Sequence, residues 1–342
     1  MFHRPLLALT MVGALCSSFL SPASAQAKAD LERKDVLSWL MRIHEAASHR
    51  NFQGTFIVSA GGAVSSAHIA HYCQGSNQYE HIESLDGETR HVLRHNDLVH
   101  TLWPHEHVAV VEQRNKLSSF PAILQGGEGH IADFYEVRSQ GLERVAGHEA
   151  NVLLLRPRDA YRFGYRLWSE SASGLLLRAD VLGDQGEILE SSAFSDVSIN
   201  VKPQPDAVMQ PMKRLDGYRV VKAVFTPTSL DAEGWSLHPG VPGFRQVSCI
   251  RRPLDGPQRI EQGGPGSEAL QTTFSDGLTH VSVFIEPFNP ERNTKSMLTT
   301  IGATKTMMRR QGDWWVTVVG DVPATTLKAF AFGLSHKAEH KK

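Results

Sequence analysis

Histidine is the residue type with the greatest potential for chemistry in this 342-residue chain, which contains 17 of them. His44, Glu45 and His49 approach the zinc-protease pattern, but histidines five positions apart lie on different faces of a helix and cannot bind one ion. The other close pairs are His105 with His107, which would share a strand face, and His68 with His71, which would not. The spacing therefore favours surface or structural histidines, and it predicts no metal site and no cofactor.

The sequence contains no persuasive catalytic arrangement. No serine lies in a nucleophile elbow, and the stretch Gly263–Ser267 lacks the lysine of a phosphate-binding loop. Acidic residues are spread along predicted turns and strand edges, as is usual for solvated carboxylates; they include Asp180, Asp184, Glu187 and Glu190. We therefore predict that the protein is not an enzyme. A metal-dependent enzyme is an alternative that only the number of histidines motivates.

The composition is that of an ordinary globular chain. Hydrophobic residues make up 41% and charged residues 21%, and the length is sufficient for two domains. The formal net charge is -1, so the chain has no overall basic field of the kind that attracts nucleic acid. A nucleic-acid partner is therefore not expected.

Residues 1–25 are predicted to form a cleavable signal peptide. A short basic start precedes the apolar stretch Leu6–Leu20, and Ala23-Ser24-Ala25 fits a cleavage site. The apolar stretch is too short for a comfortable membrane span. We expect the mature chain to begin near Gln26 and to be exported.

The mature chain contains two cysteines, Cys73 and Cys249. Export permits a disulfide, and a bridge between positions so far apart would fasten two predicted domains together. Two buried free thiols are the alternative. We favour the free thiols, because unpaired cysteine is commonly buried.

The clearest fold signal lies at 165–199, which is typical of three antiparallel strands. Apolar and polar residues alternate along Tyr165–Glu170 and again along the second strand. The turn residues of Gly183–Gly186 then allow the chain to reverse into Glu187–Ile199. The residues predicted to share one face of the second strand are Leu175, Leu177, Ala179 and Val181.

The region before this meander is predicted to contain a helix followed by an extended antiparallel sheet. Apolar residues recur at helical spacing from Asp30 to about Asn51. Turn residues at intervals of about ten residues then separate short strands. The predicted strands are 51–58, 66–73, 77–85, 89–95, 98–103, 107–112, 142–145 and 149–157, with a short helix at 131–135.

A proline-rich stretch predicts a linker at 203–217. It would separate a large domain, 26–202, from a small C-terminal domain, 218–336, and a loose tail at 337–342. Strands in the small domain are predicted at 244–252, 278–286, 302–308 and 314–319, and a helix at 323–332. The predicted fold class is α+β with mostly antiparallel β-structure.

Five stretches of the chain are distinctive in combination. They are NFQGTFIV at 51–58, RPRDAYRFGYRLW at 156–168, GLLLRADVLGDQGEILE at 174–190, DGLTHVSVFIEP at 276–287 and GATKTMMRRQGDWWVTVVGDVPATTLKAFA at 302–331. Together they resemble the MucB/RseB family over nearly all of the mature chain. The resemblance implies a large domain similar to the lipoprotein carriers LolA and LolB, which is a half-open β-barrel with covering helices. It implies a smaller domain built of a sheet and a helix.

The resemblance also implies a periplasmic negative regulator of an envelope-stress sigma factor. Members of the family bind the periplasmic domain of a single-span anti-sigma factor and shield it from site-1 proteolysis. Lipid or lipopolysaccharide fragments are thought to promote release of that complex. The implied partners are therefore an anti-sigma factor and a lipid, and a homodimer is left open.

An apolar sheet face in the large domain is the expected lipid site, because each buried CH₂ contributes about 0.8 kcal/mol. Its apolar candidates are Phe56, Val58, Leu98, Leu102, Tyr165, Leu167, Leu175 and Leu177. Candidates to meet lipid phosphates are Arg156, Arg158, Arg162 and Arg166. The alternative is that the apolar residues fill the core and that the arginines pair with local carboxylates.

The resemblance implies that the partner binds the smaller domain and the crevice between the domains. The candidates are Arg251, Arg252, Thr304, Lys305, Met307, Arg309, Arg310 and Trp314, since tryptophan and arginine are common interface anchors. The alternative is an ordinary solvated hairpin whose tryptophans alternate between core and surface.

A periplasmic carrier of lipid or lipoprotein is the main functional alternative. The predicted barrel alone would suit a carrier. The additional C-terminal domain argues against this reading, because a carrier of that kind needs no second module.

Overall fold

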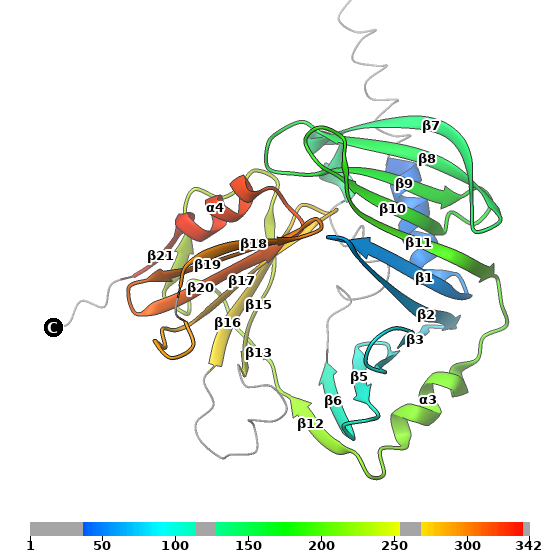
Figure 1. The fold of residues 1–342 in the computed structure, drawn as a ribbon, viewed down its shortest axis with the longest axis horizontal. Coiled ribbons are helices and arrows are strands. Elements are labelled where there is room, and N and C mark those ends of the chain that lie inside the picture. The colour runs from blue at the N-terminus through cyan, green and yellow to red at the C-terminus, as the bar shows by residue number, and fades with distance from the viewer. Residues whose placement is uncertain (1–36, 114–127, 254–267, 294, 338–342) are drawn as a thin grey trace, which may run out of the picture.

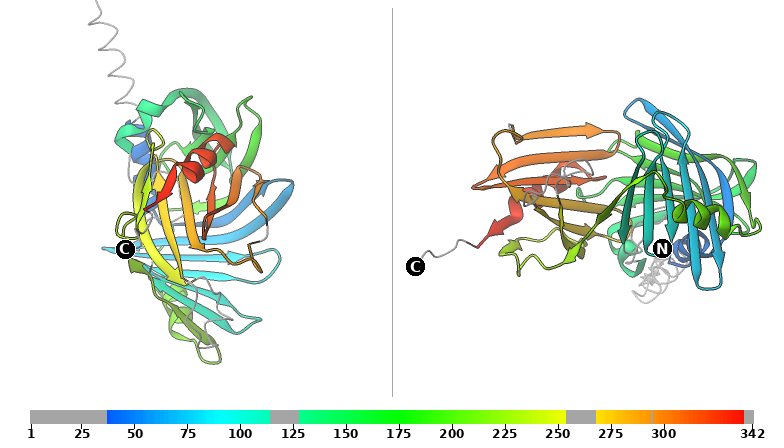
Figure 2. Two further views of the ribbon diagram at one scale, coloured as in Figure 1. Left: turned by 90° about the vertical axis from the view of Figure 1, so that its left-hand side faces the viewer. Right: turned by 90° about the horizontal axis from the view of Figure 1, so that it is seen from below.

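The computed structural model describes residues 37–113, 128–253, 268–293 and 295–337. The predicted signal peptide, the stretch Gly263–Ser267 and residues 338–342 of the predicted tail lie outside these described residues. Two bodies lie side by side, a large curved sheet and a smaller sheet that carries helix α4 (Figures 1 and 2).

The large body is built on one twelve-stranded sheet with the order β12-β6-β5-β4-β3-β2-β1-β11-β10-β9-β8-β7. Its neighbouring strands are antiparallel, apart from the parallel pair β12 and β6. Strands β12 and β7 form the two edges, so the curved sheet is half-open (Figure 1). The strands are β1 (Phe52–Ala60), β2 (Ala63–Gln74), β3 (Asn77–Ser84), β4 (His91–His95), β5 (Leu98–Trp103), β6 (Val108–Gln113), β7 (Tyr135–Val145), β8 (His148–Pro157), β9 (Gly164–Glu170), β10 (Leu176–Leu182), β11 (Ile188–Ile199) and β12 (Arg219–Ala223).

One face of the large sheet, here called the inner face, contains a cross-strand row of Leu167, Ala179, Ser192 and Val58. Period-two alternation places Phe56 and Tyr165 on the same face. The N-terminal helix, residues 37–49, and helix α2 (Glu128–Phe134) pack here through Leu40, Ile43 and Ile131. These helices cover the apolar residues that a half-open sheet leaves without a partner sheet.

The opposite face, here called the outer face, contains a cross-strand row of Thr55, His68, Glu83, His91 and Leu102. Helix α3 (Pro205–Lys213) covers part of it, because its buried residues Val208 and Met212 pack against Leu93 and Leu102. The two faces of this sheet are therefore both partly covered, by different helices.

The small body has a seven-stranded sheet with the order β13-β15-β16-β17-β20-β19-β18. Helix α4 (Ala324–Gly333) packs on it and buries Leu327 and Phe330 among valines of β17 and β20. The strands are β13 (Thr226–Pro227), β15 (Arg245–Pro253), β16 (Glu268–Ser275), β17 (His280–Pro287), β18 (Met297–Ile301), β19 (Thr304–Gln311) and β20 (Trp314–Gly320), and a separate pair is formed by β14 (Trp235–Leu237) and β21 (Leu334–His336).

The predicted fold class is confirmed: the structure is mostly antiparallel β, with a large half-open sheet, covering helices and a smaller sheet-and-helix body. The predicted strands of the meander are confirmed as β9, β10 and β11. The short helix predicted at 131–135 corresponds to α2. Strands β16 and β18 were not predicted.

The segment predicted to be a linker, 203–217, contains helix α3 instead. The residues that follow it form β12, which pairs with β6 of the large sheet, although they were assigned to the small domain. Apolar residues of α3 at helical spacing are buried on the outer face, and this burial stabilises the helix although the segment is rich in proline. We therefore propose that the division between the domains lies after Ala223.

The predicted face of the second meander strand is wrong in part. A register shift between Leu176 and Arg178 marks a β-bulge, and an extra residue reverses the alternation of side chains. As a result Leu176, not Leu175 or Leu177, packs with Tyr165 and Leu167. Leu175 and Leu177 pack in a different cluster with Phe52 and Phe194.

Both cysteines among the described residues are free thiols, Cys249 buried and Cys73 half-buried. The expectation of two unbridged thiols is therefore confirmed, although Cys73 is less buried than expected. In the part of the chain that the structure describes, no helix has the length and apolarity needed to cross a membrane.

Candidate functional site

A buried ion pair joins the two domains. Arg162, in the connection between β8 and β9, donates from Nε to Asp276 Oδ2 of the small domain over 2.7 Å, and both side chains have 0% exposure. Asp159 and the carbonyl of Pro242 accept from the same guanidinium group. Tyr135 donates its hydroxyl to Asp276 over 3.2 Å, and burial raises the pKa of this tyrosine. Each charge thus has its partner at the domain junction, which a buried pair requires.

Aromatic rings from both domains enclose Arg162. Its guanidinium carbon lies 4.2 Å from the ring centroid of Phe134 and 5.0 Å from that of Phe244. Gly243 allows this packing, because a Cβ there would lie 2.3 Å from the guanidinium, and its φ of +81° also favours glycine. The pair is held on all sides by groups from both domains.

Apolar and polar contacts continue the junction on either side of the ion pair. Leu278 of the small domain is buried in the large-domain cluster that contains Leu167 and Tyr165. Thr326 of helix α4 donates its hydroxyl to the carbonyl of Tyr161 over 2.7 Å. The small domain is therefore fastened to the large one by its 276–279 turn and by α4.

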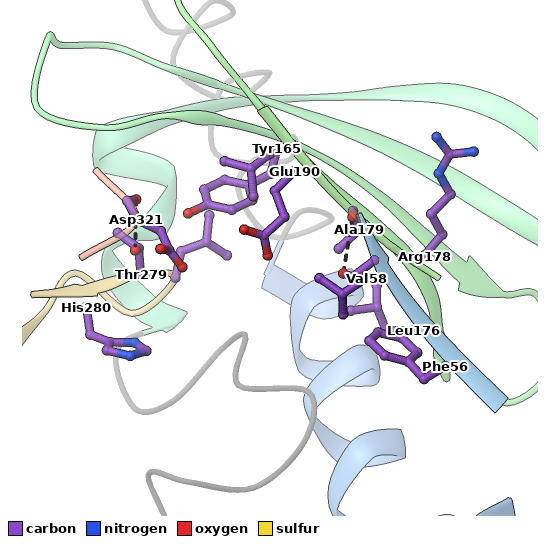
Figure 3. Close-up of a pocket in the computed structure, with 13 residues that line it drawn as sticks. Phe56, Val58, Tyr165, Leu176, Arg178, Ala179, Glu190, Thr279, His280 and Asp321 are labelled. Atoms are coloured by element: carbon purple, nitrogen blue, oxygen red, sulfur yellow. Dashed lines mark hydrogen bonds between the residues drawn. The ribbon is translucent and has the colours of Figure 1, made fainter. Parts of the chain in front are cut away.

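A cavity of about 240 Å³ lies beside this junction. Figure 3 shows Phe56, Val58, Leu176 and Ala179 along one part of it and Thr279, His280 and Asp321 of the small domain along another. The remaining lining residues are Tyr165, Arg178, Val181, Glu190, Ser192 and Leu278. The cavity is mostly apolar on the large-domain side and polar where the small domain closes it.

Two carboxyl groups face each other across the cavity. Burial and the nearby charge of Asp321 raise the pKa of Glu190. Thr304 donates its hydroxyl to Asp321 over 2.5 Å. Burial also raises the pKa of Tyr165, so its phenol stays neutral in this apolar surrounding. The acidic residues of the cavity wall are therefore Glu190 and Asp321, one from each domain, and Arg178 is a basic residue of the same wall.

The predicted lipid-binding residues divide into distinct groups. Phe56, Val58 and Tyr165 line the cavity. Leu167, Leu175 and Leu177 have 0% exposure and belong to the packed core, which was the alternative reading. Sequence reasoning missed the lining residue Leu176, because the bulge in β10 brings it to the cavity in place of Leu175 and Leu177. It placed Ala179 and Val181 on the predicted apolar face without naming them as site residues, and it missed the small-domain lining residues altogether.

Leu98 and Leu102 were expected on the same face as Phe56, and this expectation is wrong. The register places Leu102 in one row with Thr55, the neighbour of Phe56, and therefore on the outer face. Leu98 shares that face by alternation and is 41% exposed, whereas Leu102 is covered by α3. Neither residue reaches the cavity at the domain junction.

The four arginines predicted to meet phosphates do not form one group. The prediction that Arg162 meets a lipid phosphate is wrong, because this residue is buried and its donors bind groups within the domain junction. Arg166 is half-buried in β9, with its guanidinium carbon 5.9 Å from the ring centroid of Trp168. Arg156 and Arg158 are exposed, so their role in lipid binding stays a prediction.

The predicted partner-binding residues lie in two separate places. Arg251 and Arg252 are on β15, and in the sheet order β16, β17 and β20 separate this strand from β19. Arg251 pairs with Glu233 and Glu268. Met307 and Trp314 pack against the small-domain core, while Arg309 donates to the carbonyl of Ala331 and Arg310 to that of Gly312. Two members of this set lie near the cavity. Thr304 donates a hydrogen bond to Asp321, and Lys305 lies over the ring of Phe163.

A second buried polar cluster lies in the large sheet, away from the cavity. His71 Nδ1 lies 3.1 Å from Glu80 Oε1, and its Nε2 lies 3.3 Å from Cys73 Sγ. Arg94 approaches the other oxygen of Glu80 at 3.6 Å, and the ring of Phe52 stacks on the imidazole. Burial lowers the pKa of His71, but the contacts with Cys73 and the hydrogen bond and charge of Glu80 outweigh it and raise the pKa to about 9.

We expect the stability of the protein to fall as pH rises from about 6.5 to about 9. Because the pKa of His71 is higher in the folded chain than its ordinary value of 6.5, the protonated form stabilises the fold fully below that pH and progressively less above it. Thermal unfolding at a series of pH values would measure this. The variant His71→Gln should lose the pH dependence in this window, and an unchanged dependence would contradict the assignment.

The chain is similar to known proteins over nearly all of its described length. The model of the MucB/RseB N-terminal domain matches residues 35–212, and that of the MucB/RseB C-terminal domain matches residues 229–335. The sigma factor AlgU regulatory protein MucB of Pseudomonas aeruginosa is 28% identical over 316 residues, which cover 90% of this chain and 93% of the relative.

Two solved structures support the same relationship. The crystal structure of MucB in complex with MucA(peri) has 26% identity and a TM-score of 0.64, covering 89% of this chain and 100% of that one. The structure of the Pseudomonas aeruginosa MucA/MucB complex has 26% identity and a TM-score of 0.66, covering 89% and 99%. Since both family domains match in order along one chain that has the corresponding two-body fold, the protein belongs to the MucB/RseB family.

Proposed function

We propose that this protein is a periplasmic negative regulator that binds the periplasmic domain of a membrane anti-sigma factor and shields it from site-1 proteolysis. Membership of the MucB/RseB family supports this proposal, as does a relative solved in complex with MucA(peri). The predicted signal peptide at 1–25 accords with a periplasmic location.

We further propose that an acyl chain of a lipid or lipopolysaccharide binds the cavity at the domain junction and promotes release of the partner. The observation that carries this proposal is the composition of the cavity wall, which comes from both domains. A ligand that enters such a cavity contacts both domains and so acts on their relative arrangement. A ligand shifts an equilibrium only by its difference in affinity for two states, and a cavity at a junction supplies such a difference.

The cavity is too small to hold a complete acyl chain in this arrangement of the domains. Its volume of about 240 Å³ is smaller than the roughly 300–1,000 Å³ of usual ligand pockets. A complete acyl chain therefore requires the small domain, which contributes Leu278 and Asp321 to the cavity wall, to move away from the large domain. Each buried CH₂ contributes about 0.8 kcal/mol, so a few of them match an allosteric coupling of roughly 1–3 kcal/mol.

Cleavage of the anti-sigma periplasmic domain by its site-1 protease tests both parts. We expect this protein to slow the cleavage and added lipopolysaccharide to restore it. Ser192→Phe places a ring in the cavity, and this variant should still protect while losing most of the response to lipopolysaccharide. Ser198→Phe is the matched control, because Ser198 is exposed on the same strand and does not line the cavity.

The outcomes separate the two parts of the proposal. Protection that lipopolysaccharide never reverses would retain the regulator and reject the lipid-binding cavity. Absence of both protection and binding would reject the regulator and favour the carrier of lipid or lipoprotein, which the open apolar inner face would suit. Equal responses of Ser192→Phe and Ser198→Phe would place the lipid site elsewhere.

A further inference from the structure

Three potential metal ligands meet on the outer face of strands β3 and β4, away from the junction cavity. His81 and Glu83 are two positions apart on β3 and therefore point to the same side of the sheet. Glu83 pairs directly across the ladder with His91 of β4. Because strand pairing fixes the backbone on both sides, the sheet itself holds these three side chains together.

The distances suit a single ion. One ligand atom from each of the three residues lies within 4.8 Å of the others. His81 Nε2 and His91 Nδ1 are 3.1 Å apart. Two nitrogens bound to Zn²⁺ at about 2.0–2.1 Å in a tetrahedral site lie about 3.3 Å from each other, so little movement would be needed.

The surroundings of the cluster also suit a metal. His81, Glu83 and His91 are each half-buried, which leaves an open side for entry and for a solvent ligand. His68 of β2 pairs across the ladder with Glu83 on the same face, so a third imidazole lies next to the carboxylate.

We propose that His81, Glu83 and His91 form a binding site for a divalent transition metal, of which Zn²⁺ is the best match. Two imidazoles and one carboxylate are a common ligand set for Zn²⁺. The fourth position is taken by water or by His68. A bound ion would link β3 to β4 on the face that α3 also covers, and would therefore stabilise the large domain at a place away from the domain junction.

The competing account of the same geometry is a hydrogen bond between two imidazoles. One neutral ring can donate an N–H to the other over 3.1 Å without any ion. Such a pair would bind no metal in preference to the other histidines of the chain. Metal titration therefore distinguishes the two accounts.

The test is titration of the mature full-length chain, stripped of metal with EDTA, with ZnCl₂ by calorimetry. We expect one ion per chain, and Co²⁺ bound at the same site should give the visible absorption of a tetrahedral centre. His91→Gln and Glu83→Gln should each weaken Zn²⁺ binding by at least about 100-fold, since changes next to bound ligands already cost 10–100-fold. Saturation with Zn²⁺ should raise the unfolding temperature of the unsubstituted chain and not that of His91→Gln.

The matched control is His105→Gln, which removes an exposed histidine outside the cluster and should leave the titration unchanged. Unfolding in EDTA establishes that each variant is folded, and Glu83→Gln keeps the test valid if a histidine variant is not. Weak binding of several ions that responds equally to His91→Gln and His105→Gln would overturn the site. Absence of binding would leave the imidazole hydrogen bond as the explanation of the geometry.

Discussion

Replacement of Asp276 with alanine is expected to lower the free energy of unfolding by about 3–5 kcal/mol, the usual cost of removing one partner of a buried ion pair. Arg162 has 0% exposure and lies between two aromatic rings, so water cannot readily solvate it after the change. The carboxylate also accepts from the backbone of Leu278 and Thr279, and these bonds would be lost as well. Chemical denaturation, monitored by circular dichroism, measures the loss.

The control for this prediction is Asp231→Ala in the same domain. Asp231 pairs with Lys337 at the surface, where solvent screens the interaction, and its loss should change little. The double variant Arg162→Met with Asp276→Leu should recover part of the stability, because it removes both buried charges of the pair. It does not recover all of it, since Asp159 and the backbone N–H groups of Leu278 and Thr279 lose their partners. Equal stabilities of Asp276→Ala and Asp231→Ala would show that the junction pair contributes nothing.

The local parts of the fold were accessible from the sequence. Strands β9 to β11 were predictable because alternation with a period of two is interrupted by turn residues such as Gly186, whose φ is +81°. Helix α4 was predictable because Pro323 stands at its start and Gly333 at its end. In each case the signal lies within about ten residues of the element that it specifies.

The face of each strand was not accessible in the same way. Alternation separates two sets of side chains but does not say which set faces the cavity, and here both sets are apolar in places. Leu102 was assigned to the wrong face for this reason, since α3 supplies a second apolar cover that its prolines concealed. The bulge near Leu177 is a further local irregularity without a clear signal in the sequence.

Contacts between distant residues were the hardest to foresee. Arg162 and Asp276 are 114 positions apart, and the sequence offered Arg162 only as one of four basic residues. His81 and His91 are ten positions apart and meet because the β3–β4 ladder sets one register. Strand β16 was missed although Leu270, Thr272 and Phe274 alternate with more polar residues, because Thr272 breaks the apolar pattern that marks a buried strand.

Leu278→Ala is expected to cost about 2–5 kcal/mol and to uncouple the two domains. Leu278 belongs to the small domain by sequence, yet its side chain is 4% exposed within the large-domain core beside Leu167 and Tyr165. Removal of its buried atoms leaves a cavity at the contact that joins the domains, whereas each domain keeps its own core. We therefore expect calorimetry to show the unfolding of the two domains as separate transitions, where the unsubstituted chain shows a more cooperative one.

Leu327→Ala is the control for the prediction on Leu278→Ala. Leu327 is also buried, but it lies in the core of the small domain itself. Its loss should destabilise that domain and leave the contact of Leu278 with the large domain intact, although its neighbour Thr326 bonds to Tyr161. If the junction couples lipid entry to partner release, Leu278→Ala should need less lipopolysaccharide to abolish protection, because part of the work of separating the domains is already done. A lipopolysaccharide requirement that falls equally in both variants would mean that overall stability, rather than the contact at Leu278, governs release.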